Sequence, residues 1–195
     1  AINRGPNGNL WQGTAGFVYD TTLNLGENKW SGIDLAFNWV IDGWGGTWTT
    51  NLIGTYMLDR TITPLPSVPD SAYDCVGLVN VRCYPAPEWR HTADVQYDSN
   101  EWWSITARWR FFDGVEYTGT ADLIAGDEMG SNQNYIDLSA RFTFLENHDL
   151  TLGVNNIFDK EPPMVGGTLT TNANTYAGFY DTLGRYLFAQ ATFRF

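Results

Sequence analysis

The sequence is poor in charge, and most of the charge that it carries is negative. Only 17% of the residues are Asp, Glu, Lys or Arg, and 11 basic residues stand against 22 acidic ones, for a net charge of -11. A protein that binds nucleic acid needs basic side chains to neutralise phosphates, so we expect no nucleic-acid partner. No run of about 18 apolar residues occurs either, which argues against a transmembrane helix.

Cysteine and histidine are scarce as well. Cys75 and Cys83 lie in one Pro-rich stretch, PLPSVPDSAYDCVGLVNVRCYPAPEW, and the two histidines are His91 and His148. This set offers too few ligands for a zinc site, so we expect no metal, no other cofactor, and a disulfide between the two cysteines. A disulfide indicates an oxidising compartment or a cell surface.

Aromatic residues, in contrast, are abundant at 15% of the chain, which favours strands. Period-two alternation recurs throughout, no stretch has convincing helical periodicity, and the class is therefore all-β. The expected strands are approximately 14–25, 30–42, 46–60, 88–98, 102–113, 133–145, 149–158 and 184–195. The connections alternate between short turns and long loops, so an up-and-down order places every long loop at one end.

Each expected strand has one apolar face and one polar face. In YIDLSARFTFL, for example, Ile136, Leu138 and Ala140 alternate with Asp137 and Ser139. Charges such as Asp34, Asp94 and Arg108 fall in the polar register. Two architectures produce this alternation: a soluble β-sandwich, whose apolar faces pack together, and a membrane barrel, whose apolar face contacts lipid.

The large aromatic residues favour the barrel. Three strands carry two aromatic residues eight positions apart on the apolar face, a rise of roughly 20 Å in a tilted strand, close to the ~25 Å apolar band of an outer-membrane barrel. These pairs are Trp48 and Tyr56, Trp89 and Tyr97, and Trp103 and Phe111. The predicted row at the short-turn end is Trp39, Trp48, Tyr97, Trp103, Phe144, Phe193 and Phe195, and that at the long-loop end is Tyr56, Trp89, Phe111 and Phe158.

Two polar residues do not fit this register. His91 and Asn156 both fall on the apolar face, and we expect a bulge or a shifted strand end near each. The two histidines would lie at opposite membrane surfaces, and no set of Ser, His and acid converges. We therefore expect that the protein is not an enzyme.

The C-terminal third resembles the closing strands of TonB-dependent outer-membrane receptors and transporters. The segments LTLGVNNIFDKEPP and YDTLGRYLFAQATFRF match the Gly-Val-x-Asn-hydrophobic-Phe-Asp-Lys stretch, the Gly-Arg turn and the terminal Phe of that family. Weaker similarity occurs in LNLGENKWSGIDLAFNW and CYPAPEWRHTADVQY. The residues that carry the main resemblance are Gly153, Val154, Asn155, Asn156, Ile157, Phe158, Asp159, Lys160, Pro162, Pro163, Tyr180, Asp181, Gly184, Arg185 and Phe195.

The resemblance implies the last eight strands of a 22-stranded transmembrane antiparallel β-barrel, with residues 1–195 as a barrel segment and the N-terminal plug domain absent. The implied function is import of a scarce nutrient, such as a metal chelate or carbohydrate, driven by inner-membrane energy. The implied partners are outer-membrane lipid and lipopolysaccharide, the plug and remaining strands of the same protein, a TonB-type energy transducer, and the assembly machinery that reads the C-terminal strand. The alternative is a complete, closed eight-stranded barrel with a structural or adhesive role.

Candidate substrate-binding residues come from the outer loops and the polar face. They are Tyr73, Tyr84, Tyr117, Tyr176, Tyr180, Arg108, Arg110 and Asp137. The tyrosines offer rings that stack on a sugar or an aromatic chelate, but they would serve equally to pack the loops together. The charged residues would also be explained by an ion-paired barrel wall.

Overall fold

The computed structural model describes residues 2–5, 8, 17–18, 26–68, 70–118, 130–144, 148–165 and 174–194. The chain divides into two compact units, Ala1–Glu27 with Thr63–Ala72, and Asn28–Ile62 with Tyr73–Phe195. Within the first unit, β1 (Ile2–Asn3) pairs antiparallel with β2 (Phe17–Val18). Across the described ranges, no helical segment has the length and hydropathy needed to span a bilayer.

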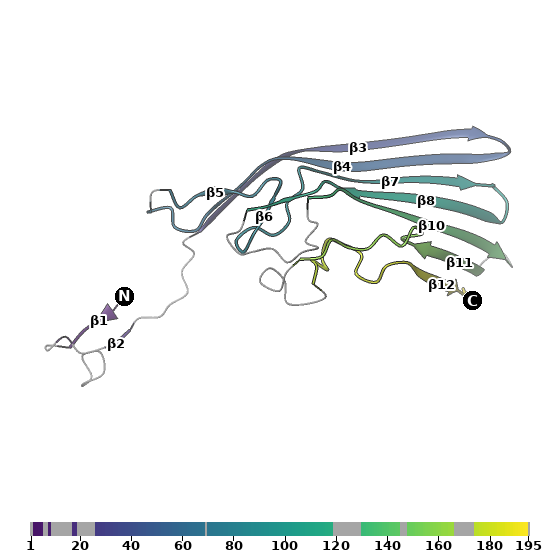
Figure 1. The fold of residues 1–195 in the computed structure, drawn as a ribbon. Coiled ribbons are helices and arrows are strands. Elements are labelled where there is room, and N and C mark those ends of the chain that lie inside the picture. Colours follow the sequence, from purple (N-terminus) through teal and green to yellow (C-terminus); the bar gives the residue numbers. More distant parts are fainter. Residues whose placement is uncertain are drawn as a thin grey trace. The chain divides into compact units, whose positions relative to one another are not determined.

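A single large sheet dominates the second unit (Figure 1). Its strands are β3 (Glu27–Gly43), β4 (Gly46–Thr63), β7 (Trp89–Asp98), β8 (Trp103–Phe112), β10 (Gln133–Phe144), β11 (His148–Asn155) and β12 (Tyr186–Thr192). They lie side by side in chain order, and the pairs from β4 to β12 are antiparallel. The short β5 (Tyr73–Asp74) pairs with β4 and completes an eight-stranded sheet. The all-β, antiparallel prediction is therefore confirmed.

The predicted first strand, 14–25, is a strand at its described residues, but these do not join the large sheet. Only Phe17 and Val18 of this range are described, and they pair with β1 in a separate small sheet. The remaining residues of that range lie outside the described residues, as does the C-terminal Phe195. The eighth member of the large sheet is instead β5, which lies in a stretch that the alternation marked as a loop.

Cross-strand register keeps the two faces of the sheet distinct. Ala107 of β8 lies opposite Leu138 of β10 and Val95 of β7, so the apolar residues form continuous rows across the strands. On the other face, Arg108 lies opposite both Asp94 and Asp137. Because side chains alternate across a strand, this register places Val95, Ala107 and Leu138 on one face and the charges of these strands on the other.

Aromatic rings form a row at the short-turn end of the sheet. Trp48, Tyr97 and Trp103 follow one another across β4, β7 and β8, with ring centroids 4.9 and 5.4 Å apart. Further along the same end, His148 lies 5.8 Å from Phe144 and 5.4 Å from Phe193. The row therefore contains two groups of rings in contact, one on β4, β7 and β8 and one near the ends of β10, β11 and β12.

A second aromatic group lies at the long-loop end, and it includes His91. The His91 ring is stacked on Phe111 at 5.2 Å and meets Trp109 edge-on at 4.4 Å. The indole Nε1 of Trp89 donates a hydrogen bond of 2.8 Å to His91 Nδ1. The strand pairs run unbroken past this residue, which lies opposite Gly54 and Phe111. The expected bulge near His91 is therefore wrong, because hydrogen bonding and ring stacking accommodate the imidazole among its aromatic neighbours.

Asn156, the second misfit, lies just past the end of a strand. β11 ends at Asn155 rather than at 158, and Asn156 has a left-handed backbone with φ of 51°. Its side chain accepts a hydrogen bond from Lys160 N and donates one to Lys160 O, both 2.8 Å long. Asn tolerates this conformation better than most residues, so the NNIFDK stretch forms a turn. The predicted strand 149–158 is wrong beyond Asn155, and Phe158 is 76% exposed in the turn.

The long connections have small cores of their own. Cys75 and Cys83 form the predicted disulfide, buried against Ala86 with Met57, Ile62 and Tyr73 around it. A second cluster gathers three connections, because β6 (Leu78–Val79) pairs in parallel with β9 (Glu116–Tyr117) and the 174–180 segment packs against both. Its buried members are Val79, Val115, Val165, Tyr176 and Tyr180, with Tyr117 and Phe179 at its edge.

Candidate functional site on the polar face

Two arginines of β8 form the centre of the polar face. Arg108 and Arg110 lie two positions apart, so both side chains project from the same face of the strand. Arg108 Nε and Nη2 bind the two carboxylate oxygens of Asp94 at 2.7 and 3.2 Å. This pair joins β8 to β7 and is half open to solvent at the arginine.

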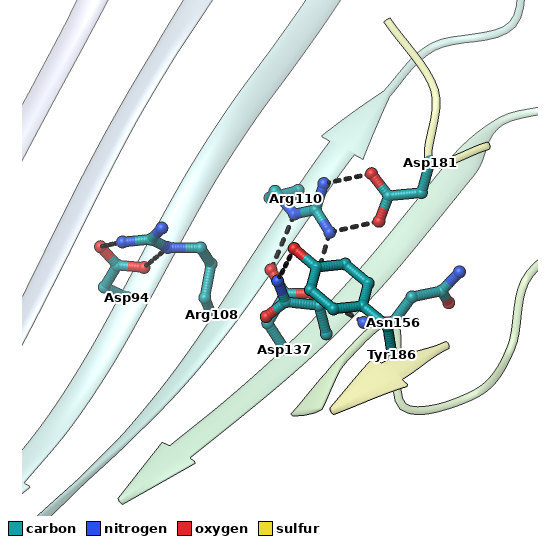
Figure 2. A network of polar contacts seen from close by, with 8 residues as sticks. Asp94, Arg108, Arg110, Asp137, Asn156, Asp181 and Tyr186 are labelled. Atoms are coloured by element: carbon teal, nitrogen blue, oxygen red, sulfur yellow. Dashed lines mark hydrogen bonds and ion pairs between the residues drawn. The ribbon is translucent and has the colours of Figure 1, made fainter. Parts of the chain in front are cut away.

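Arg110 is the hub of a larger ion-pair network, which Figure 2 shows. Its Nε and Nη2 donate hydrogen bonds of 2.8 Å to the two oxygens of Asp137 on β10. Its Nη1 and Nη2 donate bonds of 2.8 and 2.6 Å to the two oxygens of Asp181. All three side chains are largely buried, with exposures of 22% for Arg110, 14% for Asp137 and 20% for Asp181.

Neighbouring groups hold this network in place. The Arg110 guanidinium lies over the ring of Tyr135, 5.0 Å from its centroid, a distance suited to a cation–π contact. The backbone N–H of Asn156 donates to Asp137 Oδ1 at 2.9 Å, so the turn after β11 is attached to the same carboxylate. Asp137 therefore links strand β10, strand β8 and the start of the last long connection.

A hollow of about 340 Å³ opens beside the network. Both arginines, Asp137 and Asp181 line it, and hydroxyl and amide groups and aromatic rings from the neighbouring strands complete the wall. Asn155 Nδ2 donates a hydrogen bond to the hydroxyl of Tyr186, which fixes two of these groups across β11 and β12. The other lining residues are Thr106, Leu138, Ser139 and Phe188. This mixture suits a small polar solute that carries charge or several hydrogen-bonding groups.

The loop tyrosines adopt mainly packing positions. Tyr176 and Tyr180 are buried in the loop cluster, where burial raises the pKa of Tyr180 to about 12 and also raises the pKa of Tyr176. Tyr84 is exposed and meets Tyr176 edge-on at 6.1 Å, and Tyr73 lies against the disulfide. Hydroxyls held neutral by burial act as packing groups and hydrogen-bond donors, not as acids at neutral pH.

Of the predicted site residues, the structure brings Arg108, Arg110 and Asp137 together and leaves the tyrosines in the loops. The member that sequence reasoning did not assign to a site is Asp181, although it belongs to the YDTLGR stretch that carries the family resemblance. The strands carry equal numbers of positive and negative charges at this site: Arg108 and Arg110 against Asp94 and Asp137. The alternation of the strands therefore gave no reason to expect an additional acidic residue from a loop.

A second polar cluster fastens the last strand near the short-turn end. Asp149 of β11 accepts hydrogen bonds of 2.8 Å from Arg141 Nη2 and from Thr143 Oγ1, and Arg194 Nη2 lies 3.7 Å away. At the long-loop end, two residues that carry the family resemblance are joined in the same way, because Asp159 Oδ1 accepts a hydrogen bond of 2.7 Å from the Arg185 N–H. The preceding Gly184 has a φ of 65°, a backbone conformation that suits glycine. Among the described residues, no group of His, Cys, Asp and Glu is arranged to hold a metal ion.

Comparisons with protein-family models, curated proteins and solved structures found no match for this chain.

Proposed function

We propose that this chain forms part of the wall of a bacterial outer-membrane β-barrel, as the C-terminal barrel segment of a TonB-dependent transporter. In this proposal the apolar face contacts lipid, the polar face lines the lumen, and the long connections lie outside the cell. The transporter imports a scarce nutrient, such as a metal chelate or a carbohydrate, and takes its energy from the inner membrane through the plug of the same protein.

The observation that carries the proposal is the uncovered apolar face of the sheet. Leu138, Leu152 and Leu187 lie on neighbouring strands in that register, with exposures of 40%, 44% and 82%. Contiguous apolar surface of this kind marks a membrane or protein contact, since it is unfavourable in water. The buried clusters of the second unit lie in the connections, and the charges of the central strands lie on the opposite face.

The aromatic groups support a membrane contact specifically. Tryptophan and tyrosine favour the two interfaces of a bilayer, where an apolar ring and a polar atom both find suitable surroundings. The row through Trp48, Tyr97 and Trp103 at the short-turn end and the group around Trp89 and Trp109 at the long-loop end fit two such belts.

The roles of the signature residues support the family. Asn156 builds the turn after β11, Asp159 binds the Arg185 backbone, and Asn155 holds Tyr186, so these residues fasten the last two strands at their loop end. Pairing β12 with β3 would close the described sheet into a barrel of seven strands, whereas bacterial outer-membrane barrels have an even number. In the described part of the chain these strands stand at opposite ends of the sheet order, so we favour the larger barrel, in which β3 pairs with a further strand of the same protein.

A topology experiment tests this proposal. Glu161 and Glu101 are both exposed, but Glu161 lies in a long connection and Glu101 in the short turn between β7 and β8. In a Gram-negative host that produces the protein containing this chain, Glu161→Cys should react with a membrane-impermeant maleimide on intact cells. Glu101→Cys should react only after the outer membrane is permeabilised.

The unsubstituted protein is the control, because its two cysteines are joined in a disulfide and should remain unlabelled without reductant. Equal labelling of both variants on intact cells would contradict the proposed orientation. Recovery of the protein outside the outer-membrane fraction would contradict the proposal as a whole. Loss of nutrient import on deletion of the energy transducer then tests the transport step.

A further inference from the structure

The Arg110 guanidinium binds two carboxylates through two different edges (Figure 2). The side edge, Nε with Nη2, holds Asp137, and the end, Nη1 with Nη2, holds Asp181. Asp137 is fixed by the sheet, because β10 is hydrogen-bonded to β8. Asp181 belongs to the irregular 174–185 segment. One carboxylate is therefore part of the wall, and the other is brought to it by a connection.

The two carboxylates also differ in how many partners they have. Asp137 Oδ1 accepts hydrogen bonds from Arg110 and from the backbone of Asn156, so its position is shared by three elements. Within the described residues, both hydrogen bonds of the Asp181 carboxylate go to Arg110. Losing Arg110 as a partner would break both of these carboxylate bonds of Asp181, whereas Asp137 would keep its bond from the Asn156 backbone.

The hollow beside the network offers room for a replacement. Its volume of about 340 Å³ accommodates a small solute, and Asp181 itself forms part of its wall. The charged lining residues are Arg108, Arg110, Asp137 and Asp181, two of each sign. If Asp181 moves away, the end of the Arg110 guanidinium is left with two unpaired N–H groups in a partly buried position, which is costly.

We infer that the end of the Arg110 guanidinium is a binding site for a carboxylate-bearing solute, and that Asp181 occupies this site as an internal substitute. A solute carboxylate displaces the Asp181 side chain and detaches it from Arg110 of the sheet, while the buried Tyr176 and Tyr180 keep the rest of the 174–185 segment packed. A carboxylate is the matching group because its two oxygens accept the two parallel N–H bonds of a guanidinium end, as those of Asp181 do. As the ligand site of a transporter this inference rests on the proposed function, but the displacement itself does not.

Calorimetry on the purified protein in detergent tests the displacement, with succinate as the probe and neutral succinamide as its matched control. Asp181→Asn removes the competing charge and keeps the side-chain shape. An internal competitor multiplies the apparent affinity by the fraction of sites that it leaves open, so if Asp181 leaves about one site in ten open, Asp181→Asn should bind succinate about tenfold more tightly than the unsubstituted protein. Glu161→Gln, an acid-to-amide change at an exposed position of the same connection, should leave succinate affinity unchanged.

Hydrogen exchange gives a second readout. Succinate, but not succinamide, should speed amide exchange around Asp181 in the unsubstituted protein, and Asp181→Asn should show that faster exchange without any probe. Arg110→Lys keeps the positive charge but removes the pair of parallel N–H groups that bind a carboxylate. This variant should therefore show no succinate-dependent change in amide exchange.

The inference is overturned if Asp181→Asn and the unsubstituted protein bind succinate equally, if neither binds it, or if succinamide matches succinate. None of these outcomes bears on membrane orientation, which the cysteine labelling measures separately. Correct labelling with no succinate response would leave the barrel proposal standing and remove this site.

Discussion

At the level of single residues, two glycines within strands allow aromatic rings of neighbouring strands to pack directly against the backbone. A side-chain carbon built on Gly54 would lie 2.3 Å from the Trp89 ring, and one built on Gly153 would lie 2.4 Å from the Phe188 ring. Each ring belongs to the neighbouring strand, directly opposite or diagonal to the glycine. Glycine therefore lets a large ring lie flat against the sheet, which covers the backbone that glycine leaves bare.

Gly54→Ala tests this role. The added methyl group cannot fit beneath Trp89 without displacing the ring, and such overpacking typically costs about 1–3 kcal/mol of unfolding free energy. Gly43→Ala is the matched control, because a carbon built there meets nothing within 4 Å. Denaturant titration followed by tryptophan fluorescence measures both. Equal stability of the two variants would show that the ring does not depend on Gly54.

Residues also show where alternation fails as a guide. Asn156 continues the period of β11 on paper, but its left-handed backbone ends the strand, and the paired bonds to Lys160 build a turn. The doublet Asn155–Asn156 before IFDK was the available signal, since Asn favours turns and left-handed positions. The expected bulge at His91 was wrong for another reason: the imidazole packs against two rings of the neighbouring strand β8, a contact that no local sequence pattern reports.

At the scale of elements, the connections are small packed units. β6 and β9 pair in parallel, the Asn80 side chain donates to Thr118 Oγ1 at 2.9 Å, and Tyr180 meets Phe112 edge-on at 6.3 Å. The disulfide fastens the same region through Cys75 and Cys83. The connections are therefore held together by contacts between side chains and by the disulfide, with only two-residue strands as regular secondary structure.

This packing predicts a loss of stability at alkaline pH. Unfolded tyrosine has a pKa of about 10, and burial raises the pKa of Tyr180 to about 12 in the folded protein. The stabilisation is complete below the unfolded pKa and is lost as pH rises from there through the folded pKa, since only the unfolded chain ionises readily in between. Tyr180→Phe keeps the ring but cannot ionise, so its denaturation midpoint should fall less over this range. Identical pH profiles for the two proteins would contradict the assignment.

The strands themselves were largely predictable, because burial on one face imposes a period of two that the sequence records directly. The ranges 46–60, 88–98, 102–113 and 133–145 correspond closely to β4, β7, β8 and β10. The short strands β5, β6 and β9 were not foreseen. Two-residue strands carry no period, and their pairing depends on partners far along the chain.

At the scale of the whole sheet, the two faces separate two kinds of chemistry. One face carries Leu138, Leu152 and Leu187 uncovered, and the other carries the Arg110 network and the hollow. Sequence alternation predicted this division and named Arg108, Arg110 and Asp137 on the polar face. It could not predict that Asp181 completes the ion-pair network, because an irregular connection that returns to the sheet has no periodic pattern in its sequence.

We propose that the apolar face of the sheet lies in lipid, and arginine substitutions measured in reconstituted vesicles test this placement. Ala107 and Leu138 are cross-strand partners on the apolar face, whereas Thr106 precedes Ala107 on the polar face. Reversible unfolding from the bilayer should show that Ala107→Arg and Leu138→Arg each cost about 2–4 kcal/mol, and that Thr106→Arg costs much less. Equal costs at all three positions, or no cost at Ala107 and Leu138, would contradict the claim.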